Sequence, residues 1–253
     1  MRVRILPSAP GAGDLQHLIT FVVEDRLAID AGCLGLCGTP QEQAAVTSVF
    51  LTHSHADHVC SLPFFAMNVV DATGQGATVH APADVVEVLH DDLFNWRTWP
   101  DFTALRQDGR PLVELVTIEP RHPVTRDGLT VTAIPINHPV PTVAYLVDDG
   151  DGAVLFATDT GPTEEVWEVA SRSSGLRAAF IDVAFPDEME DLAAITGHLT
   201  PRLACHEIAR LPSHVIKVAV HLKPAFRQRI VDQLEALPAD NLAIGRIGWE
   251  YEF

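Results

Sequence analysis

The densest group of side chains able to do chemistry lies in Thr52–His58, which reads Thr-His-Ser-His-Ala-Asp-His. Three imidazoles and one carboxylate within six residues offer the nitrogen and oxygen donors that zinc prefers. One ion cannot easily take all four donors from so short a loop, and alternate residues point to different sides. The spacing therefore predicts that His53 and His55 serve one ion, and Asp57 and His58 another. A chance surface cluster is a poor alternative, because the chain has only 12 histidines.

Two ions need further ligands, and the chain offers three candidates in the right places. His138, Asp159 and His221 each come just after a strand-like run of apolar residues. A single histidine at the end of a strand is more often structural than metal-binding. The order His-x-His-x-Asp-His, then His, Asp and His, changes that judgement and predicts one shared site.

The elements that must position these residues follow from apolar periodicity. Strands are expected at Val3–Leu6, Leu18–Val23, Leu27–Asp30, Ser48–Leu51, Val79–Ala81, Leu112–Ile118, Leu129–Ile136, Val143–Val147, Ala153–Ala157, Ala178–Val183 and Val215–Val220. Helices are expected at Val59–Val70, Ala83–Leu93, Glu164–Ser173, Pro201–Ala209 and Ala225–Leu237. Two strand-rich blocks flanked by helices predict two sheets packed face to face with helices outside. No linker or repeat divides the sequence, so residues 1–253 are expected to form a single domain.

The excess of acidic residues limits the kinds of binding partner that can be expected. Acidic residues outnumber basic ones 34 to 17, and lysine occurs only at Lys217 and Lys223. Proteins that grip nucleic acid along its backbone need a basic surface, so a long polyanion is not an expected partner. A small anion held by local metal charge remains compatible with this composition, and a homodimer is left open.

The expected location is the cytoplasm, without membrane attachment. No stretch reaches the ~18 uninterrupted apolar residues of a membrane span. Met1–Pro7 alternates like a strand and lacks the apolar segment and cleavage site of a secretory signal. The four cysteines include no Cys-x-x-Cys pair, so they are expected to be reduced thiols.

The ordered ligand set resembles the metallo-β-lactamase superfamily. That resemblance implies an αββα four-layer sandwich, in which these loops gather at one edge of the sheets. It also implies two divalent metal ions, zinc first and manganese or iron(II) as alternatives. By resemblance, the first ion takes His53, His55 and His138, the second takes Asp57, His58 and His221, and Asp159 bridges both.

Further segments resemble one branch, the class II 3′,5′-cyclic-nucleotide phosphodiesterases. The matching pieces are Ile29–Gly32, Thr52–His58, His90–Trp96, Trp99–Phe102, Asp159–Pro162, Phe185-Pro186, Gly197–Pro201 and His221–Pro224. The Phe-Asn-Trp and Gly-His-Leu-Thr-Pro pieces are more specific than the metal motif. Asp182 departs from the branch, which more often has a Glu there. The resemblance implies a small anionic nucleotide as substrate.

One histidine outside the ligand set is a catalytic candidate. His198 lies between Gly197 and Thr200-Pro201, just before a predicted helix, where backbone N–H groups favour an anion. It would contact phosphoryl oxygens or protonate the leaving alkoxide. The other six histidines are expected to be structural or on the surface: His17, His80, His90, His122, His206 and His214.

The ligand set, the segments that resemble the phosphodiesterase branch and His198 together predict hydrolysis of cyclic AMP or cyclic GMP to the 5′-monophosphate. A hydroxide bridging two metals would attack phosphorus, and Asp57 could orient its proton while remaining a ligand. Candidates for an aromatic slot that binds the base are Phe94, Trp96, Trp99 and Phe102.

Three alternatives remain open. A tRNA 3′-processing endonuclease would share the ligand order and a histidine placed like His198, but it should carry a basic, Gly-rich arm that is not visible. A lactonase or other ester hydrolase could use the same site. A non-catalytic metal-binding module is the least favoured, because the ligand set is intact.

Overall fold

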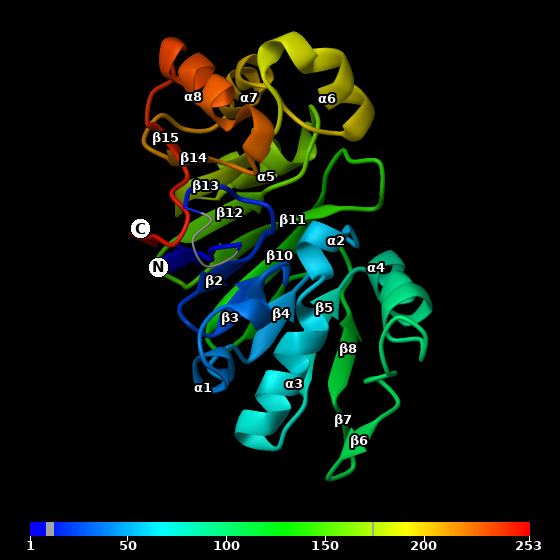
Figure 1. Cartoon of the computed structure of the whole chain (residues 1–253). Coiled ribbons are helices and arrows are strands. Elements are labelled where there is room, and N and C mark those ends of the chain that lie inside the picture. Colours follow the sequence, from blue (N-terminus) through cyan, green and yellow to red (C-terminus); the bar gives the residue numbers. More distant parts are fainter. Residues whose placement is uncertain (9–12, 174) are drawn as a thin grey trace.

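The computed structural model describes residues 1–8, 13–173 and 175–253. Two seven-stranded sheets pack face to face, and helices cover their outer sides (Figure 1). This arrangement confirms the expected αββα fold. Both sheets are mixed, with parallel pairing in one half of each sheet and antiparallel pairing in the other half.

The first sheet comes mainly from the N-terminal half of the chain. Its strands in spatial order are β16 (Glu250–Glu252), β1 (Arg2–Ile5), β2 (Phe21–Val23), β3 (Leu27–Ile29), β4 (Ser48–Phe50), β5 (Ala77–Ala81) and β8 (Val113–Thr117). The helices of this half are α1 (Pro40–Gln43), α2 (Ala56–Val59), α3 (Leu62–Thr73) and α4 (Ala83–Val88). A small hairpin projects from it, made of β6 (Arg106–Gln107) and β7 (Arg110–Pro111).

The second sheet comes from the C-terminal half. Its strands in spatial order are β15 (Leu242–Ile244), β14 (Ile216–Val220), β13 (Leu176–Asp182), β12 (Ala153–Ala157), β11 (Val143–Asp148), β10 (Leu129–Pro135) and β9 (Val124–Arg126). Its helices are α5 (Glu165–Arg172), α6 (Glu190–Thr196), α7 (Pro201–Ile208) and α8 (Arg227–Ala236).

Apolar side chains fill three layers, one between the sheets and one between each sheet and its helices. Between the sheets, the rings of Phe21, Phe156 and Phe180 lie 5.1 to 5.3 Å apart, centroid to centroid. Tyr145 donates its hydroxyl hydrogen bond across this layer to Leu51 O at 2.7 Å. This bond ties the second sheet to the chain immediately before the histidine-rich motif.

The helix expected over Val59–Val70 is wrong in its start and its continuity. Helix α2 already begins at Ala56, so Asp57 lies in a helical first turn rather than in a strand-to-helix loop. A second helix, α3, then starts at Leu62. Pro63 explains the break, because its ring nitrogen has no hydrogen to donate back to the preceding turn.

Other differences concern short elements. The helix expected over Ala83–Leu93 is α-helical only to Val88, and a π-helical turn follows over Leu89–Leu93. Sequence analysis gave no expectation for α1, α6, β6, β7, β9, β15 or β16. Within the described ranges, none of the helices is both long and apolar enough to cross a bilayer.

Candidate metal centre

Five strand ends converge at one edge of the sandwich. Strands β3 and β4 are parallel, as are β12, β13 and β14, so within each group the carboxyl ends point the same way. Such edges are where mixed and parallel α/β sheets place their ligands. The polar residues at or just beyond these ends are Asp30, His53, Asp159, Asp182 and His221.

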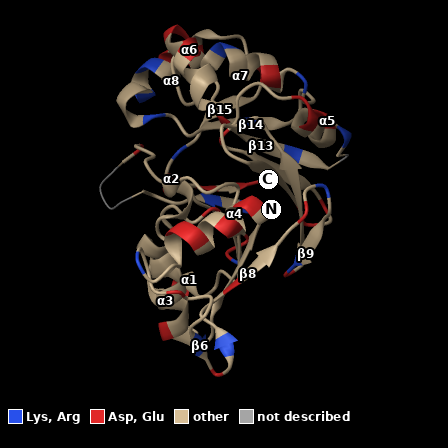
Figure 2. Cartoon of the chain, turned by 90° about the vertical axis from the view of Figure 1, so that its right-hand side faces the viewer, with Lys and Arg blue, Asp and Glu red and all other residues tan. Residues whose placement is uncertain are grey.

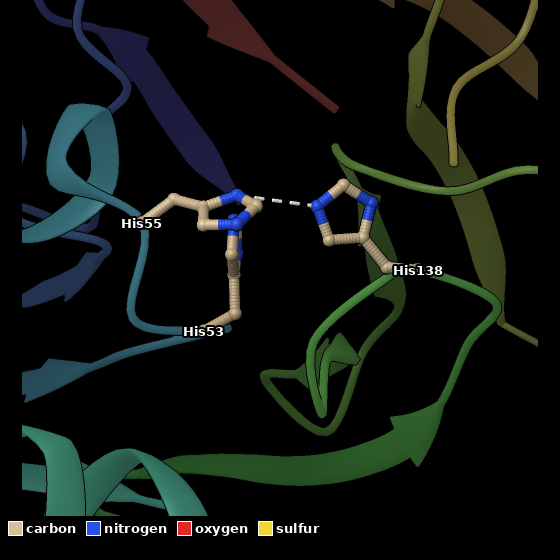
Figure 3. A group of neighbouring side chains, drawn as sticks. All are labelled: His53, His55 and His138. Atoms are coloured by element: carbon tan, nitrogen blue, oxygen red, sulfur yellow. Dashed lines mark hydrogen bonds between the residues drawn. The ribbon is translucent and has the colours of Figure 1, made fainter. Parts of the chain in front are cut away.

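A first donor group joins the motif to the loop after β10. One ring nitrogen from each of His53, His55 and His138 lies within 4.8 Å of the others, and Figure 3 shows the three rings pointing towards one another. His138 Nε2 is 3.3 Å from His55 Nδ1. The opposite nitrogen of His138 donates a hydrogen bond to Gly197 O at 2.9 Å, which leaves Nε2 with its lone pair.

Gly197 is required for this arrangement on two grounds. Its φ is +68°, a left-handed conformation that side chains disfavour. A Cβ atom there would stand 2.4 Å from Pro139 Cδ and 2.9 Å from His138 Nδ1. Any larger residue would therefore push the His138 ring away from the other donors.

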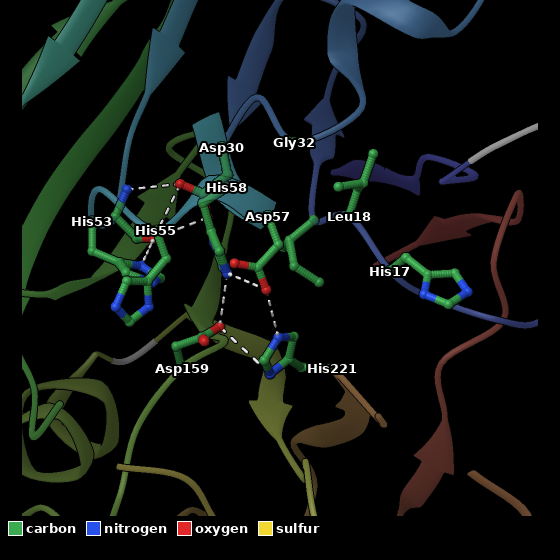
Figure 4. A network of polar contacts seen from close by, with 12 residues as sticks. His17, Leu18, Asp30, Gly32, His53, His55, Asp57, His58, Asp159 and His221 are labelled. Carbon is green, nitrogen blue, oxygen red and sulfur yellow. Dashed lines mark hydrogen bonds and ion pairs between the residues drawn. The ribbon is translucent and has the colours of Figure 1, made fainter. Parts of the chain in front are cut away.

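A second donor group lies beside the first. Asp57, His58 and His221 offer atoms within 4.8 Å of one another, and Asp159 groups with His58 and with His53 of the first set. His221 Nε2 is 3.4 Å from Asp57 Oδ2. Figure 4 shows Asp159 facing both His58 and His221. The structure thus brings all seven expected donors together, with Asp159 between the two groups.

The atoms that meet here fit a cation. His58 Nδ1 donates to Asp30 Oδ2 at 2.7 Å, so its Nε2 presents a lone pair. That nitrogen lies 3.2 Å from Asp159 Oδ1, yet neither atom has a hydrogen bond of acceptable geometry, and both are buried. His53 Nε2 is likewise buried without a partner. Two bonds of about 2.1 Å to one tetrahedral zinc would separate such donors by about 3.4 Å.

Two carboxylates outside the donor set orient the rings. Asp30 accepts from His58 and also from the Thr52 backbone N–H. Asp182 accepts from Nδ1 of His221 at 3.2 Å and from Nδ1 of His198 at 3.0 Å. Such partners fix the tautomer and direction of metal-binding imidazoles. Asp30 and His221 both have left-handed backbones, with φ of +62° and +61°, which marks locally strained positions at this edge.

The buried carboxylates make this edge strongly attractive to positive charge. Burial alone would lower the pKa of His58, but Asp159 and Asp30 outweigh it and raise that pKa well above its ordinary value. Burial also opposes the charged form of His221, yet Asp159 and Asp182 raise the pKa of His221 to about 9. Protons or divalent cations can supply the positive charge that these carboxylates require.

His198 lies at the rim of the two groups and is 6% exposed. Its ring centroid is 5.3 Å from that of His138 and 5.1 Å from that of His221. Because Asp182 holds Nδ1, the free Nε2 is the atom left for chemistry. The structure therefore places His198 next to the donor groups, as the sequence predicted, with a carboxylate behind it.

The family model of the beta-lactamase superfamily domain matches residues 33–222, a range that contains all seven donors. The chain belongs to the metallo-β-lactamase superfamily. Membership in this superfamily and the donor set together imply divalent metal binding.

Three individual proteins are similar to this chain in sequence or in fold. It is 26% identical over 208 residues to a probable 3′,5′-cyclic-nucleotide phosphodiesterase of Yersinia pestis, covering 73% of this chain and 59% of that protein. It is 23% identical over 165 residues to ribonuclease BN of Erwinia tasmaniensis, covering 60% and 50%. The chain thus spans 50% to 59% of the length of these relatives. Unliganded yeast PDE1 shares the fold, with a TM-score of 0.78, 15% identity and 98% coverage of each chain.

Two of the four aromatic residues expected to form a base-binding slot do not fit that role. Phe94 and Phe102 are 1% and 4% exposed and stack on each other inside the apolar layer beneath α3 and α4. Trp99 is half-buried against Phe64. Trp96 is 63% exposed with φ of +64°, so it alone of the four is displayed on the surface.

Charged groups on the metallo-β-lactamase fold are unevenly placed. In Figure 2, acidic residues dominate the α4 helix, while Lys and Arg are scattered over the face drawn. In the described part of the chain, no Lys or Arg nitrogen lies within 4.0 Å of the carboxylates of Asp57, Asp159 or Asp182. The positive charge that these carboxylates require would therefore come from protonated histidines or from bound divalent cations.

No chemical role was expected for Asp30 or Asp182 from the sequence. Asp30 was expected only as the last residue of a strand and part of a segment shared with the phosphodiesterase branch, and Asp182 only as a strand residue that departs from that branch. Both lie at or just beyond the end of a central strand, the same signal that identified Asp159 and His221. A carboxylate at a strand end was therefore a usable signal for orienting residues as well as ligands.

Proposed function

We propose that this chain is a two-metal hydrolase that opens 3′,5′-cyclic nucleotides to 5′-monophosphates. The observation that carries the proposal is the pair of donor groups sharing Asp159, with the His198–Asp182 pair beside them. The similarity to the probable cyclic-nucleotide phosphodiesterase of Yersinia pestis supports this substrate class. The imidazole and carboxylate donors favour zinc as the native ion.

Two divalent ions in this site would supply Lewis acidity, activating water at neutral pH and neutralising charge at phosphorus. The protein's own part is to hold donors in fixed directions, which Asp30, Asp182 and Gly197 O do through hydrogen bonds to Nδ1 atoms. Asp57 is partly exposed and has a second carboxylate oxygen with which to accept a proton from the attacking water.

His198 is suited to protonate the leaving 3′ oxygen. Its Nδ1–H is committed to Asp182, so a second proton on Nε2 can be passed to the alkoxide as the P–O3′ bond breaks. The carboxylate of Asp182 stabilises the positive charge that the ring carries before this transfer. Trp96 offers an exposed face on which a base could stack.

A second candidate is RNA 3′-end cleavage, favoured by the similarity to ribonuclease BN. It would use the same metals, and His198 in the same role. The formal net charge of −17 and the absence of an expected basic arm argue for the smaller substrate.

A substrate panel with metal analysis tests the proposal. Protein purified without chelator should carry about two zinc-class ions per chain and should turn over cyclic AMP or cyclic GMP faster than a lactone or a precursor tRNA. Bis(p-nitrophenyl) phosphate serves as a general phosphodiester. Manganese or iron would change only the ion. Faster cleavage of tRNA or lactone would overturn the substrate, and activity unaffected by chelation would overturn the metal mechanism.

A further inference from the structure

Lys223 is one of only two lysines in the chain, and it stands beside the candidate metal centre. The other, Lys217, is 4% exposed and directs its ammonium at backbone carbonyls, the nearer being Pro212 O at 3.3 Å. Lys223 is only half-buried, and its Nζ lies 3.4 Å from His221 Nε2. In this acidic protein, a lysine ammonium thus lies at the edge of the candidate metal centre.

The Lys223 ammonium makes fewer hydrogen bonds in the structure than it has hydrogens to donate. An ammonium has three donors and no acceptor, and it is strongly hydrated when free. In the described part of the chain, no carboxylate oxygen lies within 4.0 Å of Lys223 Nζ. Its polar contact is with His221 Nε2, at 3.4 Å. Lys223 is therefore not an ordinary ion-pair partner of the nearby Asp57.

The backbone around Lys223 is held firmly, so the side chain cannot simply swing away with its loop. Lys223 N–H donates to Ala184 O at 3.3 Å, and Lys223 O accepts from Phe226 N–H at 2.9 Å. His221, two residues earlier, is anchored through its own N–H to the buried side chain of Gln16 at 2.9 Å. Lys223 therefore keeps its position relative to His221.

Metal binding would disrupt the contact between Lys223 Nζ and His221 Nε2. His221 Nδ1 is committed to Asp182, so Nε2 is the nitrogen available to an ion. An ion on Nε2 would occupy the lone pair and put a second positive charge beside the ammonium. Like charges this close repel strongly unless an anion lies between them.

We propose that Lys223 binds a phosphoryl oxygen of the substrate directly, on the His221 side of the centre. This inference rests on the proposed function for the identity of the anion as a phosphate ester. Lys223 and His198 approach the ring of His221 from different elements, so one can hold a phosphoryl oxygen while the other serves the leaving oxygen.

The test measures binding of inorganic phosphate to zinc-loaded protein by isothermal titration, with metal content determined for every variant. Lys223→Met should weaken phosphate binding roughly 10- to 100-fold, the range for a lost charge-assisted hydrogen bond. Lys223→Arg, which keeps the charge, should recover much of the loss. Arg227→Met is the matched control, because this substitution also removes one positive charge from the same segment. The Arg227 guanidinium already pairs with Asp14 at 3.4 Å. Its phosphate affinity should stay within about twofold of the parent.

Three outcomes would overturn the role of Lys223. These are unchanged phosphate binding in Lys223→Met, an equal loss in Arg227→Met, and zinc loss in Lys223→Met, which would mean that Lys223 only positions His221. The proposed function fails separately. If the parent protein binds phosphate through Lys223 yet opens no cyclic nucleotide, the anion site stands and the substrate must be another phosphate ester.

Discussion

Two fully buried histidines lie in contrasting electrostatic environments in this fold. His58 lies at the strand-end edge, with Nδ1 2.7 Å from Asp30 and Nε2 3.2 Å from Asp159. His80 lies in the middle of β5, where neither ring nitrogen has a partner. Its ring stacks on Phe50 with centroids 4.5 Å apart.

The comparison separates burial from electrostatics. Burial disfavours the charged imidazole in both places. At His80 burial acts with the positive charge of Arg126 and lowers the pKa to about 4. At His58 two carboxylates reverse the direction and raise the pKa. The edge of the sandwich is thus built to hold positive charge, whereas its interior excludes it.

Removing the shared carboxylate should have the largest effect. Asp159→Ala should abolish turnover and lower the metal content, since Asp159 faces both donor groups. It also removes one of the two carboxylates that distinguish His58 from His80. Metal analysis and steady-state kinetics check this, with the exposed Asp191→Ala as control. Near-normal turnover in Asp159→Ala would show that the carboxylate does not bridge two ions.

His198→Ala should leave both metals bound and slow hydrolysis by roughly 10²–10⁴, the range for a lost general acid. His198 is nearly buried like His58, but its free Nε2 lies at the rim of the donor groups. A p-nitrophenolate leaving group needs little protonation, so activity should recover on bis(p-nitrophenyl) phosphate. Equal losses on both substrates would indicate phosphate binding instead. Metal loss would make His198 a ligand.

Asp30→Asn tests the other carboxylate beside His58. It should weaken metal binding roughly 10- to 100-fold, the usual cost of losing a partner that orients a ligand. Competition with a chromophoric chelator measures the affinity. Asp25→Asn is the control, because Asp25 lies in the turn between β2 and β3 and pairs with Arg2 and Arg4 on the surface. Unchanged zinc affinity in Asp30→Asn would mean that Asp30 does not orient His58 for a metal.

The fold class, and the meeting of the seven candidate donors at one edge, were predictable because their signals are local. The motif follows β4 directly, and each remaining donor follows a strand with a clear apolar run. The central strands β2, β3 and β4 are buried along their whole length, and apart from Ser48 their residues are all apolar, so these strands are easy to find in the sequence. The order of these signals along the chain was enough to predict both sheets.

What sequence missed depends on distant contacts or on very short elements. Asp30 meets His58 28 positions away, and Asp182 meets His221 39 positions away, which no local pattern records. Strands β15 and β16 have three residues each and exist because they pair with β14 and β1. Their residues carry too little alternation to predict a strand alone.

The smallest expected effect is on stability and comes from His80. Its folded-state pKa of about 4 lies below the ordinary value of 6.5, so the unfolded chain binds a proton first as the pH falls. Stability from this residue is therefore complete above pH ~6.5 and is lost as the pH drops towards 4. Between pH 7 and pH 5, the free energy of unfolding should fall by about 1–2 kcal/mol on account of His80. Urea unfolding of the parent and of His80→Phe, compared at both pH values, measures this difference.

The comparison of slopes, rather than of absolute stabilities, makes the His80 test selective. Any repacking of His80→Phe against Phe50 shifts stability equally at every pH, but the new side chain cannot titrate, so the variant's loss of stability between pH 7 and pH 5 should be smaller than the parent's. Protonation of the metal-centre histidines contributes to both proteins and cancels in the difference. His122→Gln, at a side chain that is 74% exposed, should keep the parent's slope. Equal pH dependence in His80→Phe and the parent would mean that His80 finds a partner for its proton, and the contrast with His58 would then no longer rest on burial.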